Sequence, residues 1–512
     1  AVRKTVRMYP ERADAWRLAV EIAEAGEFQS ARWQYLLRLT DLDPEALEPR
    51  LDLIEMAMRA GQLEFARENL EEIAPRAEES VRYHELAFNY HSLGEDWEAA
   101  ERHMEQLIAL QPEDARSVFD LAVVRLQQDD PQTKQEGLEA LRKIIANHPE
   151  MEAMGQRAIL IHAVGTRNEA LAQQAIDALL AKRDEISFRD LVLVLDARYR
   201  FDRPAFSRMV NELREEAAAD PDKAALLANY LNQNGFSWLV VDWLREAPED
   251  LLTHSRVQNE LTRGLLDLKD WPAIEEHLSG VTWERGEYFR YALLALAQQR
   301  QGKTNPFERN WELAVNSAQT EEGAMRNLLE QVKLWGWDEQ RIELTSQLFQ
   351  RNPRLEWAAE ELIEHHREAG DTERLSAIYE RLAEIHPDKP EIAAERARLM
   401  ILRQTDLTRA ISLARKAHES EPANPLYTAV YATALHEVGQ PEKALETFAE
   451  LVPSERIEPS QALFYTYVLA QTGQAAEAAA ILNETRFSDL LPEERDMLAR
   501  TRTLILEQQQ SA

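Results

Sequence analysis

Residues 86–100 read Leu-Ala-Phe-Asn-Tyr-His-Ser-Leu-Gly-Glu-Asp-Trp-Glu-Ala-Ala, and this stretch decides the fold. The large Leu86 and the small Ala87 lie eight and seven positions before Gly94. A small residue allows two antiparallel helices to approach closely, while the neighbouring leucine fills the groove between them. Glycine ends a helix readily because it adopts the left-handed cap conformation at little cost. Ala100 supplies the matching small residue, so the stretch predicts two helices joined by a tight turn.

The same pattern recurs along the chain at a period of about 34 residues. Gly26 and Gly61 lie 35 residues apart, and Gly336 and Gly370 lie 34 apart. Small residues follow the turns at a constant spacing: Ala31, Ala66, Ala100, Ala410, Ala444 and Ala478. Prolines, which cannot continue a helix, recur near the unit boundaries: Pro10, Pro44, Pro353, Pro387 and Pro422. A repeat of this kind predicts stacked helix pairs.

Two units carry the markers of a known family most completely. In one unit the markers are Leu86, Ala87, Tyr90, Gly94, Trp97, Ala100 and Pro112, and in another they are Tyr431, Ala432, Gly439, Ala444 and Phe448. On these residues the chain resembles the tetratricopeptide repeat (TPR) family, whose units are helix-turn-helix pairs. The resemblance implies an all-α fold, an α-α superhelix of the TPR-like solenoid type. It would hold about 14 or 15 helix pairs, irregular in the middle.

The regularity of the repeat divides the chain into three predicted parts. Residues 1–115 contain regular TPR units, and the first of them begins mid-repeat, so we expect an upstream segment that could carry a signal peptide or an anchor. Residues 116–340 contain degenerate TPR-like pairs with a Trp-rich centre, and these pairs could interrupt the solenoid. Residues 341–512 contain regular units and end in an expected capping helix, Leu491–Leu506.

One short run resembles a β-strand, but the composition around it predicts a helix. Ala, Leu, Glu, Arg and Gln dominate the sequence, and all of them favour helices. The run Leu191–Leu195 alternates leucine and valine, but the helical pattern continues on both sides of it. We therefore expect this run to form the buried face of a helix.

Composition and charge exclude several classes of protein. The 512 residues include only 16 Gly and no Cys, which argues against turn-rich β folds and excludes thiol catalysis and cysteine metal sites. The formal net charge of −32 repels phosphate backbones and anionic lipid surfaces, so we expect no nucleic acid partner. No apolar run approaches the roughly 18 residues that a membrane-spanning helix needs. A basic protein partner would be attracted.

Two motifs suggest chemistry, and both have a simpler interpretation. Ala297–Thr304 fits a relaxed phosphate-loop pattern, but an amphipathic helix precedes it where a strand is required. Gly302 lies at the turn position of the repeat, so we expect an ordinary turn between helices. His365 and His366 lie beside two glutamates, but adjacent residues on a helix point about 100° apart and cannot chelate one ion together. The sequence therefore predicts no catalytic, metal or cofactor site.

Tryptophan is concentrated where the repeat markers fade. The seven residues of this group are Trp238, Trp243, Trp271, Trp283, Trp311, Trp335 and Trp337. One interpretation is that these large rings fill gaps between irregular helix pairs. The alternative is that some of them are exposed anchors for a partner, since tryptophan is enriched at binding hot spots.

The resemblance also implies a binding surface. In TPR proteins the first helix of each pair lines a concave groove that holds peptides or partner helices. By register, the groove-facing residues here would be His84, Phe88, His91, Asn229, Asn232, Glu360, Glu364, Arg367, Thr433 and His436. The basic clamp that some family members use for C-terminal carboxylates is not evident, because Ala225 stands where a lysine is needed.

These observations lead to a functional hypothesis with two alternatives. The chain is expected to be a non-enzymatic scaffold that binds a protein or peptide partner in an acidic groove. With an upstream anchor it would be a membrane-tethered assembly factor of a bacterium, on either the cytoplasmic or the periplasmic side. The alternatives are a periplasmic TPR domain of a bacterial envelope or polysaccharide export system, and a repeat module of a larger enzyme lost upstream.

Overall fold

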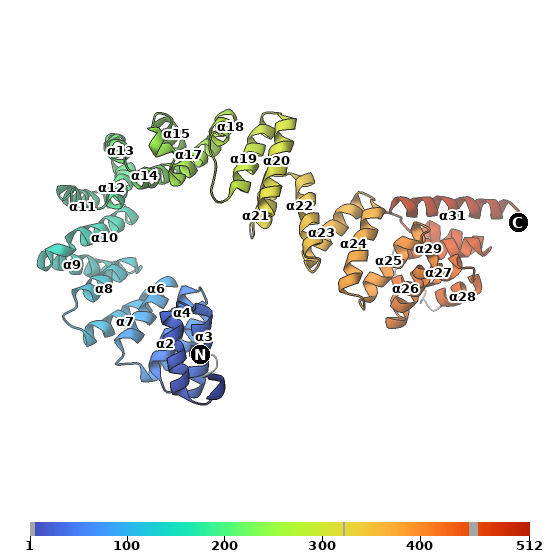
Figure 1. Ribbon diagram of the computed structural model, residues 1–512, viewed down its shortest axis with the longest axis horizontal. Helices are drawn as coiled ribbons and strands as arrows, with labels where there is room; N and C mark the ends of the chain where they lie inside the picture. Colours follow the sequence, from blue (N-terminus) through green and yellow to red (C-terminus); the bar gives the residue numbers. More distant parts are fainter. Residues whose placement is uncertain (1–5, 321–322, 450–458, 512) are drawn as a thin grey trace. The chain divides into compact units, whose positions relative to one another are not determined.

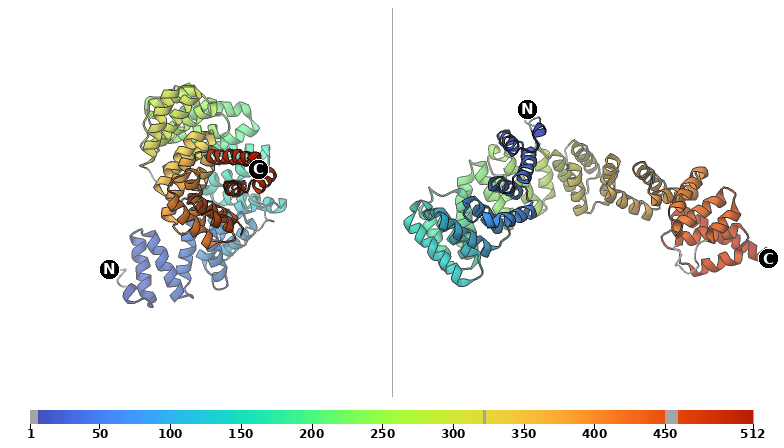
Figure 2. Two further views of the ribbon diagram at one scale, coloured as in Figure 1. Left: turned by 90° about the vertical axis from the view of Figure 1, so that its right-hand side faces the viewer. Right: turned by 90° about the horizontal axis from the view of Figure 1, so that it is seen from below.

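The computed structural model describes residues 6–320, 323–449 and 459–511, and all regular secondary structure in these residues is helical (Figure 1). The chain divides into two compact units, Ala1–Lys269 (unit 1) and Asp270–Ala512 (unit 2). Within each unit, successive helices follow one another in chain order and pack against their neighbours (Figure 2). The predicted all-α solenoid of helix pairs is confirmed.

Unit 1 contains, in its described residues, seven helix pairs followed by two further α-helices. The pairs are α2 (Ala13–Ala25) with α3 (Gln29–Leu42), α4 (Leu47–Arg59) with α5 (Leu63–Ile73), α6 (Val81–Leu93) with α7 (Trp97–Leu110), α8 (Ala115–Gln127) with α9 (Pro131–Asn147), α10 (Glu152–Gly165) with α11 (Glu169–Ala181), α12 (Phe188–Phe201) with α13 (Arg203–Ala217), and α14 (Pro221–Gln233) with α15 (Ser237–Arg245). The other helices are α16 (Glu249–Leu252), α17 (Ser255–Leu268) and the short 3₁₀ helices η1 (Ala74–Arg76) and η2 (Pro149–Met151).

Unit 2 begins with α18 (Trp271–Ser279) and continues, in its described residues, through six helix pairs to a long last helix. The pairs are α19 (Glu287–Arg300) with α20 (Thr304–Ala318), α21 (Ala324–Trp335) with α22 (Asp338–Arg351), α23 (Glu356–Glu368) with α24 (Thr372–Ile385), α25 (Pro390–Leu402) with α26 (Leu407–Ser420), α27 (Pro425–Glu437) with α28 (Pro441–Phe448), and α29 (Pro459–Gln471) with α30 (Ala475–Glu484). The last helix is α31 (Pro492–Ser511). The described residues thus contain thirteen helix pairs, close to the predicted 14 or 15, and α16, α17, α18 and α31 stand outside these pairs.

Most turns within the pairs use a left-handed residue, although not always the predicted glycine, and the turns of α8/α9 and α12/α13 use none. Gly61 and Gly439 have φ angles of 71° and 80°, as expected for a glycine cap. Gly94 has a φ of −86°, and the following Glu95 takes the left-handed conformation with a φ of 57°. The left-handed role predicted for Gly94 is therefore wrong, because the turn in this pair is shifted by one residue.

Small residues lie where the helices touch, as the sequence predicts. Ala87 of α6 and Ala100 of α7 are 1% and 0% exposed. In α9 the helix approach is closer still: a Cβ built on Gly137 would lie 2.8 Å from the carbonyl oxygen of Ala122 in α8. Only a residue without a side chain allows that spacing.

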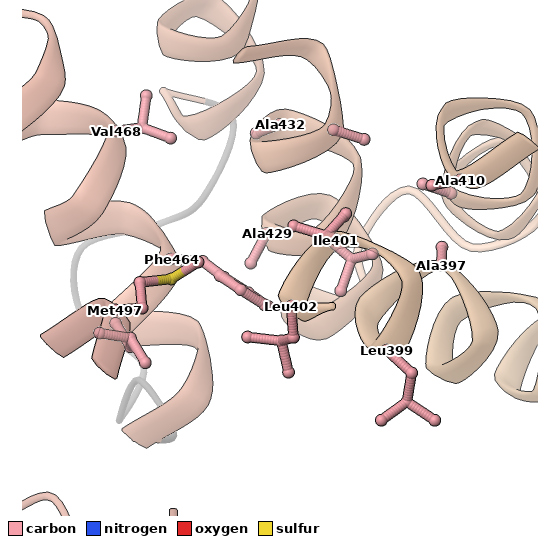
Figure 3. Packing of buried hydrophobic residues seen from close by; sticks show 14 of the residues in the cluster. Ala397, Leu399, Ile401, Leu402, Ala410, Ala429, Ala432, Phe464, Val468 and Met497 are labelled. Carbon is pink, nitrogen blue, oxygen red and sulfur yellow. The ribbon is translucent and has the colours of Figure 1, made fainter. Parts of the chain in front are cut away.

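The core of unit 2 continues from one pair to the next. Figure 3 shows Phe464 of α29 and Met497 of α31 beside Leu402 of α25, and all three side chains are buried. The cluster also contains Ala397, Ala410, Ala429 and Ala432, whose small side chains let the helix backbones approach. Apolar burial is therefore distributed along the chain of helices, as in repeat proteins generally.

Several expectations about individual segments can now be compared with the structure. The run Leu191–Leu195 lies inside α12 and is helical, as predicted. The capping helix is also present, as α31, and extends beyond the predicted Leu491–Leu506. The boundary between the compact units falls at 269/270, within the irregular stretch, and the three-part division at 115 and 340 stays a prediction.

The tryptophans divide between the two interpretations. Trp243, Trp311 and Trp337 are buried, and in unit 2 the Trp337 ring lies 5.8 Å from that of Trp311. The indole N–H of Trp311 donates to Glu343 at 3.0 Å. Trp238 is instead 57% exposed. The buried rings therefore fit the interpretation that tryptophans fill gaps between irregular helix pairs, whereas the exposed Trp238 does not.

In the described parts of the chain, no helix combines the length and the apolar character needed to cross a membrane.

The turn geometry makes a prediction about two glycines. Gly61→Ala should destabilise the protein by about 1 kcal/mol, because alanine is strained at a positive φ. Gly94→Ala should be neutral or slightly stabilising, because its φ is ordinary and the nearest atom to a new Cβ lies 3.7 Å away. Urea unfolding of both full-length variants followed by circular dichroism measures this, and equal destabilisation by the two would contradict the turn assignment.

Candidate partner-binding surfaces

All ten predicted surface residues lie on the first helix of a pair, as the register indicates. His84, Phe88 and His91 are on α6, and Asn229 and Asn232 are on α14, both in unit 1. Glu360, Glu364 and Arg367 are on α23, and Thr433 and His436 are on α27, both in unit 2. Their exposure and their contacts within the chain differ widely, and these decide which could meet a partner.

His84 is part of a buried histidine cluster between α6 and α7. It is 5% exposed, and its Nε2 donates to the carbonyl oxygen of Glu78 at 2.9 Å. With the ring neutral, its Nδ1 is then an acceptor for the Nδ1–H of His103, 3.0 Å away. The expectation that His84 lines an open groove is therefore wrong, because both ring nitrogens are used inside the helix pair.

The rest of the cluster is less enclosed. His91 stacks on His103 with ring centroids 5.5 Å apart, and its Nδ1 lies 3.2 Å from Asp96. Burial, followed by the neighbouring His84, His91 and Arg102, lowers the pKa of His103 from 6.5 to about 4. Phe88 is half-buried and packs against the small cluster of Met104, Leu107 and Leu121. His91 and Phe88 thus keep part of their surface, and their contact with a partner stays a prediction.

The two asparagines of α14 are held by one glutamate of α17. Nδ2 of Asn229 donates to Oε1 of Glu260 at 2.9 Å, and Nδ2 of Asn232 donates to Oε2 at 3.0 Å. Asn232 is only 5% exposed. The expectation that Asn232 lies on the binding surface is wrong, because it joins two helices of unit 1. Asn229 is half-buried in the same network.

In unit 2 the residues of α23 are the most accessible of the ten. Glu360 and Glu364 are exposed, one turn apart on the helix. Arg367 pairs with Glu395 of α25 at 3.5 Å, so its charge also serves the contact between neighbouring pairs. The role of these three residues in binding stays a prediction.

The residues of α27 are less available. Thr433 is fully buried, and its hydroxyl donates to the carbonyl oxygen of Ala429 at 2.8 Å. The expectation that Thr433 faces a partner is therefore wrong. His436 is half-buried against the edge of the Tyr467 ring, and burial lowers its pKa.

The last helix covers part of the first-helix row in unit 2. Helix α31 packs against the first helices α25 and α29 and against α30 (Figure 1). Near its start, Glu494 accepts from Arg398 of α25 at 2.5 Å, and Glu493 accepts from the Thr372 hydroxyl of α24 at 2.5 Å. Near its end, Gln508 donates to the carbonyl oxygen of Ala470 in α29. Helix α31 thus covers part of the faces of the first helices α25 and α29.

The ion pair under α31 is almost completely enclosed. Arg398 is 2% exposed and Glu494 is 1% exposed, and Arg398 also donates to Glu395 at 3.0 Å. The second oxygen of Glu494 accepts from the backbone N–H of Leu491. Sequence reasoning missed both residues. The available signal was an arginine within the apolar surroundings of α25, which indicates a buried partner of opposite charge.

The two motifs that suggested chemistry have structural roles here. Gly302 has a φ of 73° in the turn between α19 and α20, and Nζ of Lys303 donates to Glu275 at 2.6 Å. The predicted turn is confirmed. The rings of His365 and His366 lie 5.1 Å apart and nearly perpendicular. In residues 6–320, 323–449 and 459–511, no group of three or more His, Asp or Glu side chains is arranged to hold a metal ion.

Comparisons with known proteins give similarities of fold only. No family model matches the chain, and no curated protein matches its sequence. Among solved structures it is similar to YrrB, "a TPR protein with an unusual peptide-binding site", at 13% identity and a TM-score of 0.33, over 39% of this chain and 98% of that one. MamA matches at 18% identity and a TM-score of 0.29, over 32% of this chain and 95% of that one.

A third similarity spans more of the chain. The structure of Naa15/Naa10 bound to HypK-THB matches at 14% identity and a TM-score of 0.26, over 97% of this chain and 78% of that one. The helix pairs of the chain itself, rather than these similarities, make the fold TPR-like.

The histidine cluster makes a prediction about pH. The pKa of His103 is lowered in the folded protein, so the unfolded state takes up its proton first as the pH falls below 6.5. The stability that the neutral ring provides is complete above that pH and is lost between pH 6.5 and about 4. Between pH 7.5 and pH 5, the free energy of unfolding should therefore fall less in the His103→Gln variant than in the wild type. Urea midpoints at both pH values test this, and equal losses would contradict it.

The buried ion pair makes a second prediction. Glu494→Ala should destabilise unit 2 by roughly 3–5 kcal/mol, because it leaves the enclosed charge of Arg398 with one carboxylate fewer. Glu360→Ala, on an exposed face of the same unit, should change stability by less than about 0.5 kcal/mol. Chemical unfolding of both variants measures the difference. If both variants changed the free energy of unfolding by a similarly small amount, the packing of α31 would not depend on the Arg398–Glu494 ion pair.

Proposed function

We propose that the chain is a divergent TPR protein that serves as a non-enzymatic scaffold and binds a helical segment of a protein partner along the first helices of unit 1. The observation that carries this proposal is the position of α31. In unit 2 a helix of the chain itself lies against the first helices α25 and α29. In the described residues of unit 1, no comparable helix lies on the row of first helices.

The charge of unit 1 supports a basic partner. Residues 43–114, which span α4 to α7, contain 19 acidic and 6 basic residues, a net charge of −13 out of −32 for the whole chain. Glu85 is exposed on the first helix α6, between the buried residues that face the core. An acidic surface raises the rate at which a basic ligand associates, and salt weakens the effect.

The absence of an enzymatic role is part of the proposal. It is supported by the structural explanation found for each motif that suggested chemistry, namely Gly302 in a turn, Lys303 in an ion pair with Glu275, and perpendicular rings at His365 and His366. A scaffold needs only surfaces that are held in place by packing.

A matched pair of charge reversals tests the proposal. The full chain is used to capture partners from a lysate of its source organism, and each captured protein is quantified for the wild type and for two variants. Glu85→Lys changes the exposed first-helix surface, and Glu68→Lys makes the same change on the exposed face of the second helix α5. We expect Glu85→Lys to reduce capture of a basic partner by roughly three- to tenfold. Glu68→Lys should leave capture near the wild-type value.

Two outcomes would contradict the proposal. Equal effects of both reversals would mean that only the net charge matters and that the first helices are not the binding surface. Recovery of glycan and envelope components in place of a protein would favour the export-system alternative.

A further inference from the structure

Unit 1 has an open concavity whose charge is opposite to that of the protein. It has a volume of about 660 Å³ and lies between the turn that joins α10 to α11 and the turn that joins α12 to α13. Its lining consists of Ile161, Val164, Gly165, Arg167, Tyr199, Arg200, Phe201 and Arg203. Three of these residues are arginines and none is acidic, in a chain with 91 acidic and 59 basic residues.

The three arginines retain hydrogen-bond donors for a ligand. The backbone N–H of Arg167 donates to the carbonyl oxygen of Val164 at 3.2 Å, but its guanidinium forms no ion pair or hydrogen bond with the residues that the structure describes. Arg200 uses only its Nε, which donates to Asp196 at 2.9 Å. The guanidinium carbon of Arg203 lies 3.7 Å from the centroid of the Tyr199 ring. This stacking holds the guanidinium plane in place while its N–H groups stay at the edge of the concavity.

Aromatic packing on one side of the concavity holds Tyr199 in place. Tyr199 packs on Phe206 and Phe236, with ring centroids 5.3 Å and 5.0 Å away. Arg167 takes the left-handed turn position with a φ of 54°, where most pairs have glycine. An arginine is tolerated there although its Cβ makes that conformation unfavourable.

Two acidic residues beside the lining, Asp196 and Asp202, are occupied by other contacts. Asp196 accepts from Tyr230 as well as from Arg200. Asp202 caps helix α13 by accepting from the backbone N–H of Ala205 at 3.0 Å, and it lies 3.6 Å from Arg198. Neither carboxylate, nor the exposed Glu169 two residues after Arg167, forms an ion pair with Arg167 or Arg203 in the described chain, so the lining keeps its positive charge.

We propose that this concavity binds an acidic peptide segment in which carboxylates alternate with apolar side chains. The planar fork of arginine matches the two oxygens of a carboxylate. Ile161, which is 49% exposed, and Phe201 provide apolar surface beside the charges. The site takes a ligand of the opposite charge to the one proposed for the first helices, and it is independent of that function.

Fluorescence anisotropy with a defined probe tests the site. The probe is a short labelled peptide of alternating leucine and glutamate, blocked at both ends, and the matched probe has glutamine in place of glutamate. Both are titrated with the full chain at constant ionic strength. We expect binding of the glutamate peptide and at least a tenfold weaker binding of the glutamine peptide.

Variants of the chain locate the binding. Arg203→Gln and Arg167→Gln should each weaken binding of the glutamate peptide by at least fivefold, since each removes a bidentate donor. Arg208→Gln, an equal charge change at an exposed position of α13 outside the lining, should leave it unchanged. The Arg167 side chain has no ion pair or hydrogen bond in the described chain to lose, so its variant still tests the site if the stacking of Arg203 proves necessary for folding.

Three results would overturn the proposal. One is equal binding of the glutamate and glutamine peptides, and another is an equal loss on Arg208→Gln. The third is displacement of the peptide by inorganic phosphate at concentrations no higher than that of the peptide, which would assign the concavity to a small free anion.

Discussion

Every part of this chain depends on close contact between small residues on neighbouring helices. Helices of 13 or 14 residues such as α2, α6 and α7 would be marginal alone in water, so each is stable because it is buried between its neighbours. Ala19, Ala57, Ala66 and Ala87 are all at most 1% exposed, and these positions set the distance between helices. Stability is therefore close to a sum of interfaces between neighbouring helices.

Because the contacts are local, the period of the sequence was sufficient to predict the helix pairs. Even the stretch with few markers, for example α14 and α15, forms a pair around Gly235. The long-range contact of α31 could not be predicted in the same way. Arg398 and Glu494 lie 96 residues apart, and a repeat pattern encodes only the contacts of each helix with its neighbours. The signal that the sequence carries for this contact is an arginine within the apolar surroundings of α25, which its neighbour Glu395 pairs only in part.

The same reasoning explains why the candidate surface was predicted only in part. Register correctly places His84, Asn232 and Thr433 on first helices, but it does not say how much of a first helix remains open. A first helix such as α10 contacts the first helices before and after it as well as the second helices α9 and α11. Only a narrow stripe is then left for a partner, so a residue chosen by register alone often lies inside a contact.

This narrow stripe also explains how surfaces of opposite charge can exist within unit 1. Helix contacts need small and apolar residues, so charge is confined to faces and turns that packing leaves free, and there it is weakly constrained by the fold. An acidic excess in α4–α7 then costs little stability, because exposed charges are screened within about 10 Å in salt. The turns obey the same rule: Arg167 adopts a left-handed backbone, as Glu27 and Glu95 do in other pairs of unit 1, and its guanidinium has no ion pair or hydrogen bond in the described chain. A side chain at such a turn is left out of the helix contacts, so its charge is available to a ligand without loss of packing.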